Sequence, residues 1–512
     1  GSSAALELHV GPPAAGLHCT IQGRANACEE AALHALAEQY VHLLRQIVER
    51  PDAAVSDHCL AVVSPRVHLP DATLPLKQTP LPDVASQFHD QARRTPDAAA
   101  LQFGTRIWTY RELDASCLAL AVRLRNAGTR AATVVALQGA RSPALVAAMT
   151  ATTMCGGVFV VLDPDLPKAR RERMLGDAGA TVLCHIADDS ADAIDLALGP
   201  ACALLRIDPE LADVAPLGDS SNTFEPVRAQ PDDAICVVFT SGSTGHPKPV
   251  LASHKGLAHL VQWHATKFAV AAHDKVSLLS SLSFGTLLRD IYLPLTTGAT
   301  LCIPEEADLL DPLAWCGRRG VTIVHTTPTL LGSWLRLGAE QAPSIKIRWV
   351  CVAGEPLTDV VVRAWRSRFP SNPGFVNLYG LTETSLAKCF YIVPEQVEPG
   401  LQPVGLSLPG TQALVFGPTG VQCGIGERGE IAIRTPHLSL GYLGLDEETR
   451  RRFRPNAQRN DPRDLLYFTG DIGRYRADGM LELAGRLDDQ VKIRGVRIEP
   501  AEVTAALADL PG

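Results

Sequence analysis

Strand-like apolar runs alternate with helix-like segments over most of this 512-residue chain, from Val84 to about Val404. Such alternation is typical of an α/β architecture, in which helices cover a largely parallel sheet. The runs after Val404 are shorter and turn-rich, which predicts a smaller, mostly β unit. The length suggests about three folding units. The clearest predicted helices are 84–94, 110–127 and 144–154, and the predicted strands are 99–103, 106–110, 134–137, 157–162, 182–184, 276–279, 300–303, 321–324 and 349–352.

The first 78 residues follow a different pattern. Two alternating runs, 6–10 and 17–21, read as strands, and apolar residues at helical spacing predict a helix over 29–49 that Pro51 ends. Residues 64–82 contain five prolines and read as a linker. Two strands and one helix bury little core alone, so we expect this segment to be the severed end of a neighbouring domain.

Composition excludes several classes of protein. The net charge of −8 argues against a nucleic-acid-binding protein, because no stretch supplies a basic stripe for the phosphate backbone. The 13 cysteines are scattered without a C-x-x-C pair or a Cys/His cluster, which favours a reducing, cytoplasmic setting. We expect no signal peptide at the start of the chain. The longest apolar stretch, 144–162, is interrupted by threonines and two glycines, so we expect a helix and a strand rather than a membrane span.

One loop concentrates residue types that bind phosphate. The apolar run 234–239 leads into glycines and hydroxyls and ends on a lysine. Glycines let backbone N–H groups turn toward one point, and hydroxyls and a lysine add donors for an anion. The order G-x-x-G-x-P-K is not the Walker loop, and the alternative is a polar surface loop. The candidate residues are Thr240, Ser241, Gly242, Ser243, Thr244, Gly245 and Lys248.

Three further polar tracts stand where strands are predicted to end. Residues 377–384 join an aromatic, hydroxyls and a carboxylate; residues 467–471 set an aspartate behind a glycine; residues 485–495 mix both charges around glycines. Each tract alone is a weak signal, since Glu383 or Asp471 would more often cap a helix or complete a turn. The four tracts in this order form a strong one.

With the proline-rich turn at 157–167 and the strand 429–433, these tracts resemble the acyl-adenylate-forming superfamily, most closely the adenylation domains of nonribosomal peptide synthetases. The similarity covers roughly residues 80–512. It implies a large N-terminal α/β core of two mixed or parallel sheets with flanking helices, a small β-rich subdomain, and only the start of a C-terminal subdomain. The first 60-odd residues resemble the end of a condensation domain without its H-H-x-x-x-D motif. The implied boundaries are 1–63 for the condensation remnant, 64–82 for the linker, 83–487 for the adenylation core, and 488–512 for the hinge and C-terminal start.

The resemblance implies that a carboxylate attacks the α-phosphate of ATP to give acyl-AMP and pyrophosphate, before a carrier-domain phosphopantetheine thiol takes the acyl group. Such chemistry depends on positioning and charge stabilisation. Glu383 would hold Mg²⁺, Asp471 would accept from the ribose hydroxyls, and Asp488 would be the hinge. The implied catalytic residues are Thr240, Lys248, Glu383 and Arg486. The implied nucleotide contacts are the loop residues above with Gly354, Glu355, Asn377, Tyr379, Gly380, Thr382, Glu383, Asp471 and Arg486.

The sequence departs from the family pattern at two places. Leu483 stands where the family usually has an aromatic, which removes one expected contact to adenine or ribose. The family's catalytic lysine lies beyond the position that corresponds to Gly512. Loss of a charge that neutralises the transition state costs several powers of ten in rate. We therefore expect these 512 residues to bind ATP and acid but to adenylate weakly.

The acid pocket that the resemblance implies has an unusual amine end. Gly285 occupies the position where amino-acid-activating members carry an aspartate for the substrate ammonium, and an unpaired buried ammonium is costly. We expect a keto, hydroxy, β-amino or other polar or anionic acid. Arg289 would either meet a second polar group of the acid, alone or with His325, or pair with a structural carboxylate such as Glu305 or Glu306. The implied pocket residues are Phe284, Gly285, Thr286, Arg289, His325, Cys351, Ala353, Leu378, Leu386 and Ala387.

Three other functions stay open at this point. A stand-alone acyl- or aryl-CoA ligase would have no use for the condensation-like segment. An adenylation domain of the aminoadipate-reductase type shares the Arg289-Asp290-Ile291-Tyr292 run but keeps the aspartate that Gly285 replaces. A silent interaction module would seldom retain Lys248, Glu383 and Asp471 together. The expected partners are the acid, a carrier domain and a condensation domain, with no nucleic acid and no membrane.

Overall fold

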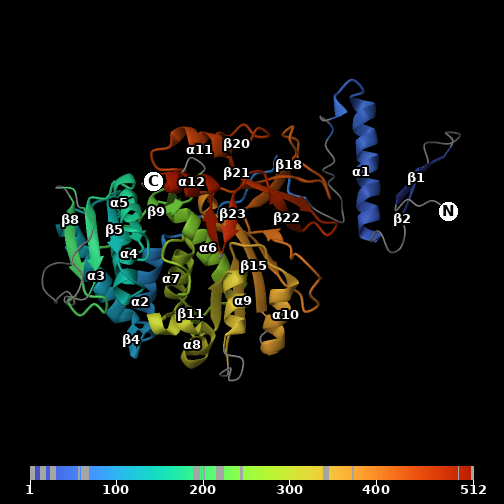
Figure 1. Cartoon of the computed structure of the whole chain (residues 1–512). Helices are drawn as coiled ribbons and strands as arrows, with labels where there is room; N and C mark the ends of the chain where they lie inside the picture. Colours follow the sequence, from blue (N-terminus) through green and yellow to red (C-terminus); the bar gives the residue numbers. More distant parts are fainter. Residues whose placement is uncertain are drawn as a thin grey trace.

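The computed structural model describes residues 6–11, 19–23, 30–55, 58, 69–187, 196–197, 199, 202–214, 224–242, 246–337, 345–371, 374–493 and 495–508. Three large sheets organise the chain, with helices packed around the first two (Figure 1). This is the α/β fold with a β-rich subdomain that the alternation of apolar runs predicts.

The first sheet has six strands in the order β10-β9-β6-β5-β7-β8. Five of them run parallel, and β10 closes the edge antiparallel to β9. Their bounds are β5 Val134–Gln138, β6 Val158–Leu162, β7 Val182–Ile186, β8 Ala203–Ile207, β9 Ala234–Thr240 and β10 Lys248–Ser253. Because β9 and β10 form a hairpin, the predicted phosphate loop is the turn that joins them.

The second sheet has nine strands in the order β17-β16-β15-β14-β13-β11-β12-β3-β4. Its centre is parallel and its edges are antiparallel. The bounds are β3 Ala99–Phe103, β4 Arg106–Thr109, β11 Lys275–Ser277, β12 Thr300–Ile303, β13 Ile323–Thr326, β14 Trp349–Ala353, β15 Gly374–Leu381, β16 Leu386–Ile392 and β17 Leu406–Ser407. The short helix η3 Thr382–Thr384 joins β15 to β16.

The third sheet is antiparallel and has five strands, with β22 added beside β21. The strands are β18 Gln412–Phe416, β19 Gly429–Arg434, β20 Phe453–Pro455, β21 Leu465–Tyr475 and β22 Leu481–Arg486. Two hairpins lie outside the three sheets: β1 Leu6–Val10 with β2 Cys19–Gly23, and β23 Val491–Ile493 with β24 Val496–Ile498.

Several helices begin at residues whose side chains cap the first turn. The Asp83 side chain accepts from the Ser86 N–H at the start of α2, and Thr109 with Glu112 forms a capping box at the start of α3. The bounds are α1 Glu30–Glu49, α2 Val84–Arg94, α3 Tyr110–Asn126, α4 Pro143–Met154, α5 Lys168–Asp177, α6 His254–Lys267, α7 Thr286–Thr297, α8 Pro312–Arg319, α9 Pro328–Arg336, α10 Asp359–Arg368, α11 Asp446–Arg452, α12 Pro500–Ala508, and the short η2 Glu306–Leu310.

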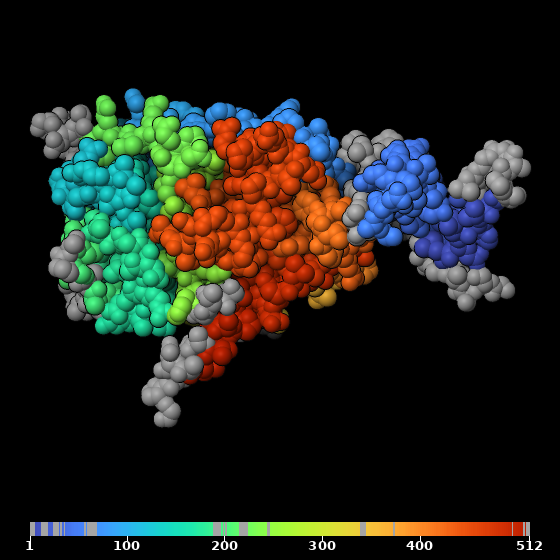
Figure 2. Space-filling model, turned by 90° about the horizontal axis from the view of Figure 1, so that it is seen from above, coloured from blue at the N-terminus to red at the C-terminus, as the bar shows by residue number. Residues whose placement is uncertain are grey.

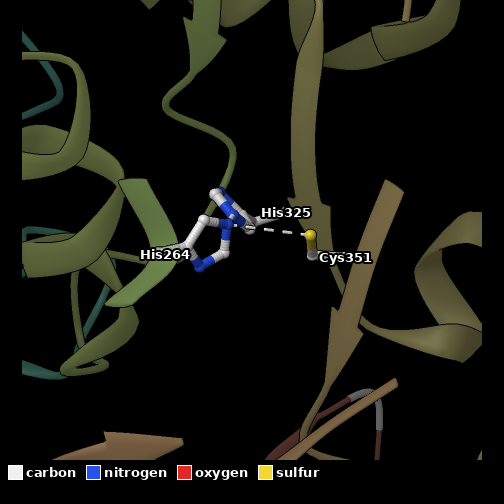
Figure 3. A group of neighbouring side chains, drawn as sticks. All are labelled: His264, His325 and Cys351. Atoms are coloured by element: carbon white, nitrogen blue, oxygen red, sulfur yellow. Dashed lines mark hydrogen bonds between the residues drawn. The ribbon is translucent and has the colours of Figure 1, made fainter. Parts of the chain in front are cut away.

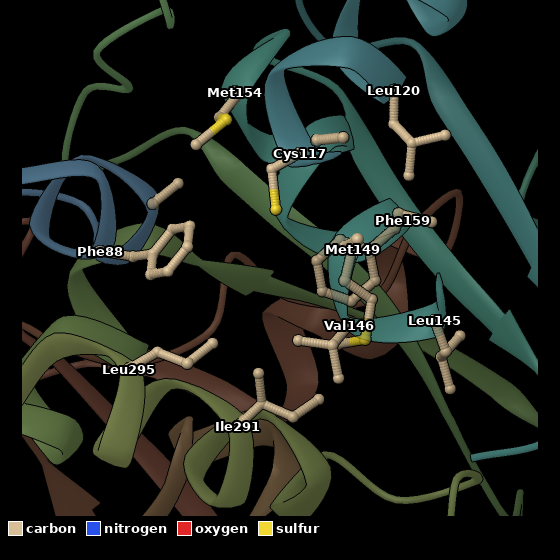
Figure 4. Packing of buried hydrophobic residues seen from close by; sticks show 14 of the residues in the cluster. Phe88, Cys117, Leu120, Leu145, Val146, Met149, Met154, Phe159, Ile291 and Leu295 are labelled. Carbon is tan, nitrogen blue, oxygen red and sulfur yellow. The ribbon is translucent and has the colours of Figure 1, made fainter. Parts of the chain in front are cut away.

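The largest hydrophobic cluster lies between the first two sheets. Phe88 of α2, Met149 of α4 and Ile291 of α7 are fully buried and belong to one contiguous core (Figure 4). Fully burying a side chain of this size contributes roughly 1.5–3 kcal/mol. The two sheets and their helices therefore form one body. Among the described residues, no helix is both long and apolar enough to cross a membrane.

The proline-rich stretch expected as a linker is docked onto the third sheet from residue 69 on. The carbonyl of Pro70 accepts from Gln422 at 2.7 Å, and that of Ala72 accepts from Asn456 at 2.9 Å. The prolines lack N–H groups, but the carbonyls of this stretch still bind the sheet. Helix α1 stands at one end of the molecule (Figure 2), where Gln39 donates to the carbonyl of Ile425.

Candidate active site

The β9–β10 turn brings Thr240 and Lys248 directly opposite each other. The turn is tight at Gly242, where a Cβ would lie 1.8 Å from the carbonyl oxygen of His246, so a side chain cannot be placed there without moving the backbone. The Ser241 hydroxyl is buried and has no hydrogen-bond partner among the described residues. Ser243, Thr244 and Gly245 lie outside the described residues. The described part of the loop thus offers a hydroxyl and a lysine at one end of the hairpin.

Lys248 is paired with a carboxylate that the sequence did not suggest. Its Nζ donates to Oε1 of Glu448 at 2.7 Å and lies 5.7 Å from the ring centre of Tyr442. Burial opposes ionisation of Glu448, but hydrogen bonds from Arg451 and Lys248 outweigh it and lower its pKa to about 2. Glu448 lies in helix α11, 200 positions from Lys248, so only the fold brings the two together.

Glu383 is buried at the end of β15, in η3. Its Oε1 accepts from the Tyr442 hydroxyl at 2.9 Å and from Nη1 of Arg497 at 3.0 Å. Burial alone would raise its pKa, but the charge of Arg497 and the hydrogen bond from Tyr442 lower it. Its Oε2 is buried without a partner among the described residues. Glu383 is therefore an ionised carboxylate with one oxygen still able to accept a bond.

Asp471 of β21 links two of the predicted nucleotide contacts. Its Oδ2 accepts from the Tyr379 hydroxyl at 2.7 Å, and its Oδ1 is ion-paired with Arg486. Arg486 also donates to both oxygens of Asp488, at 2.6 and 2.8 Å. Asp471, the expected ribose contact, thus forms one polar chain with Tyr379, Arg486 and the expected hinge residue Asp488.

The C-terminal hairpin formed by β23 and β24 contacts the predicted nucleotide residues Gly354 and Glu355. Oε1 of Glu355 accepts from the Gly495 N–H at 2.6 Å, and its Oε2 accepts from the Thr329 N–H at 3.0 Å. Gly354 faces the same hairpin, since a Cβ there would lie 3.7 Å from the Cα of Gly495. Burial lowers the pKa of Lys492, although the negative charge of Asp471 acts to raise it. Lys492, which the tract 485–495 includes without a predicted role, and Arg497, which lies beyond that tract, therefore bring two basic side chains to the site.

Other predicted nucleotide contacts are held by the backbone. Asn377 is buried and donates from Nδ2 to the carbonyl of Pro403 at 2.8 Å. At Gly380 a Cβ would lie 2.1 Å from the carbonyl oxygen of Leu386, so this position must stay without a side chain. The Thr382 carbonyl accepts from the Ser385 N–H at 3.0 Å, which closes the turn that carries Glu383. These residues shape the end of β15.

The predicted acid pocket surrounds the start of α7. Phe284 and Gly285 line a small cavity with Leu282, Val238 and Leu288. A Cβ at Gly285 would lie 3.0 Å from Cδ2 of Leu386. Leu386 has φ +70°, a conformation that non-glycine residues rarely adopt. Leu386 therefore packs over Gly285, the position at which the resemblance implies an amine-binding carboxylate in amino-acid-activating members. Thr286 begins the helix beside it.

Arg289 pairs with Asp290, and neither Glu305 nor Glu306 is its partner. Its Nε and Nη2 donate to Oδ1 of Asp290 at 3.1 and 3.0 Å, and both side chains are buried. Glu305 instead caps η2. The same Oδ1 lies 3.1 Å from Nδ1 of His325. Burial would raise the pKa of Asp290, but Arg289 and His325 lower it, so the pair is ionised.

His325 and Cys351 meet a residue that the sequence did not single out. His264 of α6 lies with its Nε2 3.2 Å from Nε2 of His325 and 3.9 Å from Sγ of Cys351 (Figure 3). Burial and the charge of Arg289 lower the pKa of His325 to about 4, and burial raises that of Cys351 to about 12. Ala353 lies on the same face of β14, beside Leu378 of β15, and Ala387 belongs to the same hydrophobic cluster.

Comparison with known proteins places this geometry in a family. The family described as AMP-binding enzyme matches residues 88–443. Tyrocidine synthase 3 of Brevibacillus parabrevis is 30% identical over 485 residues, which cover 92% of this chain and 7% of that protein. The large subunit of the L-2-aminoadipate reductase of Eremothecium gossypii is 31% identical over 539 residues, which cover 93% of this chain and 38% of that protein. The chain thus spans well under half the length of these curated relatives.

A solved structure agrees with the sequence relatives. The AMPPNP-bound crystal structure of the nonribosomal peptide synthetase FmoA3 superposes with a TM-score of 0.79 at 27% identity, over 94% of this chain and 51% of that one. The similarity extends over the sheets that carry Lys248, Glu383 and Asp471. The chain belongs to the AMP-binding enzyme family, as an adenylation domain of the nonribosomal peptide synthetase type.

Proposed function

We propose that this chain binds ATP with Mg²⁺ and activates a carboxylic acid as its acyl adenylate, for loading onto the phosphopantetheine of a carrier domain in a peptide assembly line. One observation carries the proposal. Tyr442 contacts both Lys248, through its ring, and Glu383, through its hydroxyl, so the expected phosphate ligand and the expected metal ligand lie side by side.

The residues suit the bond changes of this reaction. An oxygen of the acid's carboxylate bonds to the α-phosphorus of ATP, the bond from that phosphorus to the bridging oxygen breaks, and pyrophosphate leaves with its electron pair. Lys248 and the Ser241 hydroxyl would hold the leaving phosphates. Asp471, an acceptor already held by Tyr379 and Arg486, would fix the ribose. These groups position the reactants and stabilise charge, and none forms a covalent bond.

Glu383 fits the magnesium ion that accompanies ATP. Its Oε2 is an ionised, buried oxygen without a partner among the described residues, and Mg²⁺ prefers such hard oxygen ligands. Bound there, the ion would offset the negative charge of the phosphates. Arg497 contacts the other oxygen of the same carboxylate, so its cationic group stands beside the ion's expected position.

The acid is proposed to lack an α-ammonium group. Gly285 supplies no carboxylate, and Leu386 packs over its Cα. Arg289 already has Asp290 as its partner, which favours a neutral polar substituent over a second anion. Keto and hydroxy acids fit both conditions, and a β-amino acid fits the first. An aminoadipate-reductase-type domain is the second candidate, favoured by the Arg289–Asp290 pair and by the reductase relative.

The chain organisation supports an assembly-line setting over a free CoA ligase. We propose that residues 1–63 are the end of a condensation domain, that the core begins near residue 83, and that residues 488–512 start a C-terminal subdomain. Helix α1 contacts the connection between β18 and β19 through Gln39, which donates to the Ile425 carbonyl, as expected for a neighbouring domain. Because the family's lysine lies beyond residue 512, we expect these 512 residues alone to bind nucleotide while exchanging pyrophosphate near background.

Calorimetric titration with Mg·ATP tests the binding half of the proposal. We expect the unaltered chain to bind, Asp471→Asn to lose at least tenfold in affinity, and Glu383→Gln to lose the dependence on Mg²⁺. Glu482→Gln, in β22 and paired with Arg474, is the matched control and should bind as the unaltered chain does. No binding by the unaltered chain, or equal binding by all four proteins, would refute the proposal.

A further inference from the structure

Two imidazoles and one thiol from three different elements point toward a single place in the core. His264 comes from α6, His325 from β13 and Cys351 from β14 (Figure 3). His325 and Cys351 are direct partners in the parallel ladder, so their side chains leave the same face of the sheet, toward α6. The exposed fractions of the three residues are 0%, 0% and 1%. The sheet and the helix together build this cluster.

The spacing of the donor atoms suits a tetrahedral ion. Bond lengths of about 2.0–2.1 Å to nitrogen and 2.3 Å to sulfur give tetrahedral edges of roughly 3.3 Å between nitrogens and 3.6 Å from nitrogen to sulfur. Nε2 of His264 lies 3.2 Å from Nε2 of His325 and 3.9 Å from Sγ of Cys351. All three donor atoms lie within 4.8 Å of one another. The nitrogen–nitrogen distance matches the tetrahedral edge, and the nitrogen–sulfur distance from His264 is about 0.3 Å longer than its edge.

The surroundings orient the ring of His325 for coordination. Oδ1 of Asp290 lies 3.1 Å from its Nδ1 without an aligned hydrogen bond, and the negative charge there favours the proton on Nδ1, which leaves Nε2, 3.2 Å from Nε2 of His264, to bind a metal ion. A carboxylate behind a coordinating histidine is the usual outer partner at metal sites. The Arg289 guanidinium pairs with the same carboxylate and holds it in place.

The ring of His264 is held by packing. Its ring centre lies 5.6 Å from that of Trp263, in an edge-on arrangement, and 4.7 Å from that of Phe268. These contacts fix the direction of its Nε2 although its Nδ1 has no partner among the described residues. A neutral imidazole pair with a thiol is a borderline-soft donor set, which selects Zn²⁺ or a similar ion over Mg²⁺.

We infer that His264, His325 and Cys351 form a binding site for a zinc-class transition-metal ion, with the fourth coordination position open. Sites with three protein ligands retain an exchangeable position for water or another small donor. His325 and Cys351 are two of the predicted acid-pocket residues, and Ala353 follows Cys351 on the same face of β14, so the site forms part of the wall of the proposed acid pocket. The inference does not depend on the proposed function, because the donors and their spacing stand without it.

Cobalt spectroscopy tests the site directly. The chain is freed of metal with a chelator, checked by elemental analysis, and titrated with Co²⁺ alone. We expect one Co²⁺ per chain, with the strong visible bands of tetrahedral cobalt and a thiolate-to-cobalt charge-transfer band, both abolished when Zn²⁺ displaces the cobalt. Cys351→Ser should remove the charge-transfer band, and His264→Gln or His325→Gln should weaken binding at least tenfold. Asp290→Asn should weaken it about 10–100-fold.

Cys389→Ser is the matched control, since Cys389 is an equally buried strand cysteine outside the cluster. It should keep the complete spectrum. If Cys351→Ser does not fold by circular dichroism, the charge-transfer band of the unaltered chain and its loss to Zn²⁺ still decide the question. The inference is refuted if the unaltered chain shows nothing but the spectrum of hydrated Co²⁺. It is also refuted if the charge-transfer band survives in folded Cys351→Ser. In either case the cluster is a hydrogen-bonded imidazole pair beside a thiol.

Discussion

Nη1 of Arg497 lies 3.0 Å from Oε1 of Glu383, so the carboxylate proposed to hold Mg²⁺ is already paired with a cation from the C-terminal hairpin. Nη2 of Arg497 also lies 3.8 Å from Oε1 of Glu499. Burial opposes the charge on Arg497, but Glu383 outweighs it and raises the pKa of the guanidinium. This contact couples the position of the hairpin to the charge state of the site.

In the absence of nucleotide, Arg497→Met should lower the free energy of unfolding of the chain. Removal of one partner from a buried ion pair leaves the other charge unpaired and typically costs about 3–5 kcal/mol. Urea denaturation should therefore show a loss of this order, and Mg·ATP should restore more stability to the variant than to the unaltered chain. Arg474→Met, which breaks a half-exposed pair with Glu482, should cost less than about 1 kcal/mol. Equal losses in the two variants would contradict the account.

Glu448→Gln should change how stability depends on pH. The pKa of Glu448 is lowered from 4.5 to about 2, so its contribution is fully present above pH 4.5 and disappears as the pH falls toward 2. The variant should lose less stability than the unaltered chain over this window in acid denaturation followed by circular dichroism. It should also bind ATP a few-fold more tightly, since Lys248 loses a competing carboxylate. Parallel acid curves would count against the pairing.

Lys388→Met should stabilise the chain near neutral pH. Lys388 lies fully buried in β16, its Nζ has no partner among the described residues, and burial lowers its pKa from 10.5 to about 7. Between these two pH values the unfolded chain binds this proton and the folded chain does not, so stability rises with pH. The free energy of unfolding of the variant should exceed that of the unaltered chain by on the order of 2–4 kcal/mol near neutral pH.

The gain in Lys388→Met should shrink as the pH rises toward the unfolded pKa of lysine. Urea denaturation at several pH values measures it, with Lys267→Met, at the far end of α6, as the control that should change little. A gain that is independent of pH would mean that the methionine merely packs better, and no gain would mean that Lys388 has a partner.

Gly285→Asp should bring back the ability to use common α-amino acids. The new Cβ meets the flexible end of Leu386 at 3.0 Å and Val238 at 3.7 Å, so the backbone need not move, although the buried carboxylate should cost several kcal/mol of stability until an ammonium pairs with it. Pyrophosphate exchange driven by α-amino acids should rise at least tenfold in a chain with a complete C-terminal subdomain. Gly285→Asn has the same size without the charge and should give no such rise. An equal rise in both variants would refute the assignment of Gly285.

The sequence predicts elements well where local signals agree. Helix α2 has the predicted bounds because Asp83 caps its start and Pro96 follows its end. The predicted strand 321–324 begins two residues too early, because the ladders with β11 and β14 begin only at Ile323. A local apolar pattern does not show where pairing with neighbouring strands begins.

Partners that meet across the fold leave little signal in the sequence. Glu448 and Arg497 are polar residues in ordinary charged segments, and only tertiary packing brings them to Lys248 and Glu383. The glutamates after β12 are plausible partners for Arg289 by sequence, although its actual partner is the next residue in α7. Adjacent helical side chains usually diverge, so burial of both charges was needed to bring them together. His264 gives no signal because its motif is formed only in space.

Acid-dependent pyrophosphate exchange tests the central claim most directly. A chain with a complete C-terminal subdomain is incubated with Mg·ATP and labelled pyrophosphate across α-amino, β-amino, keto, hydroxy and dicarboxylic acids. We predict exchange with at least one acid that lacks an α-ammonium group, little with common α-amino acids, and loss of the signal in Asp471→Asn. Absence of exchange with every acid, while Mg·ATP still binds, would contradict acid adenylation. A strong preference for a common α-amino acid would contradict the role given to Gly285.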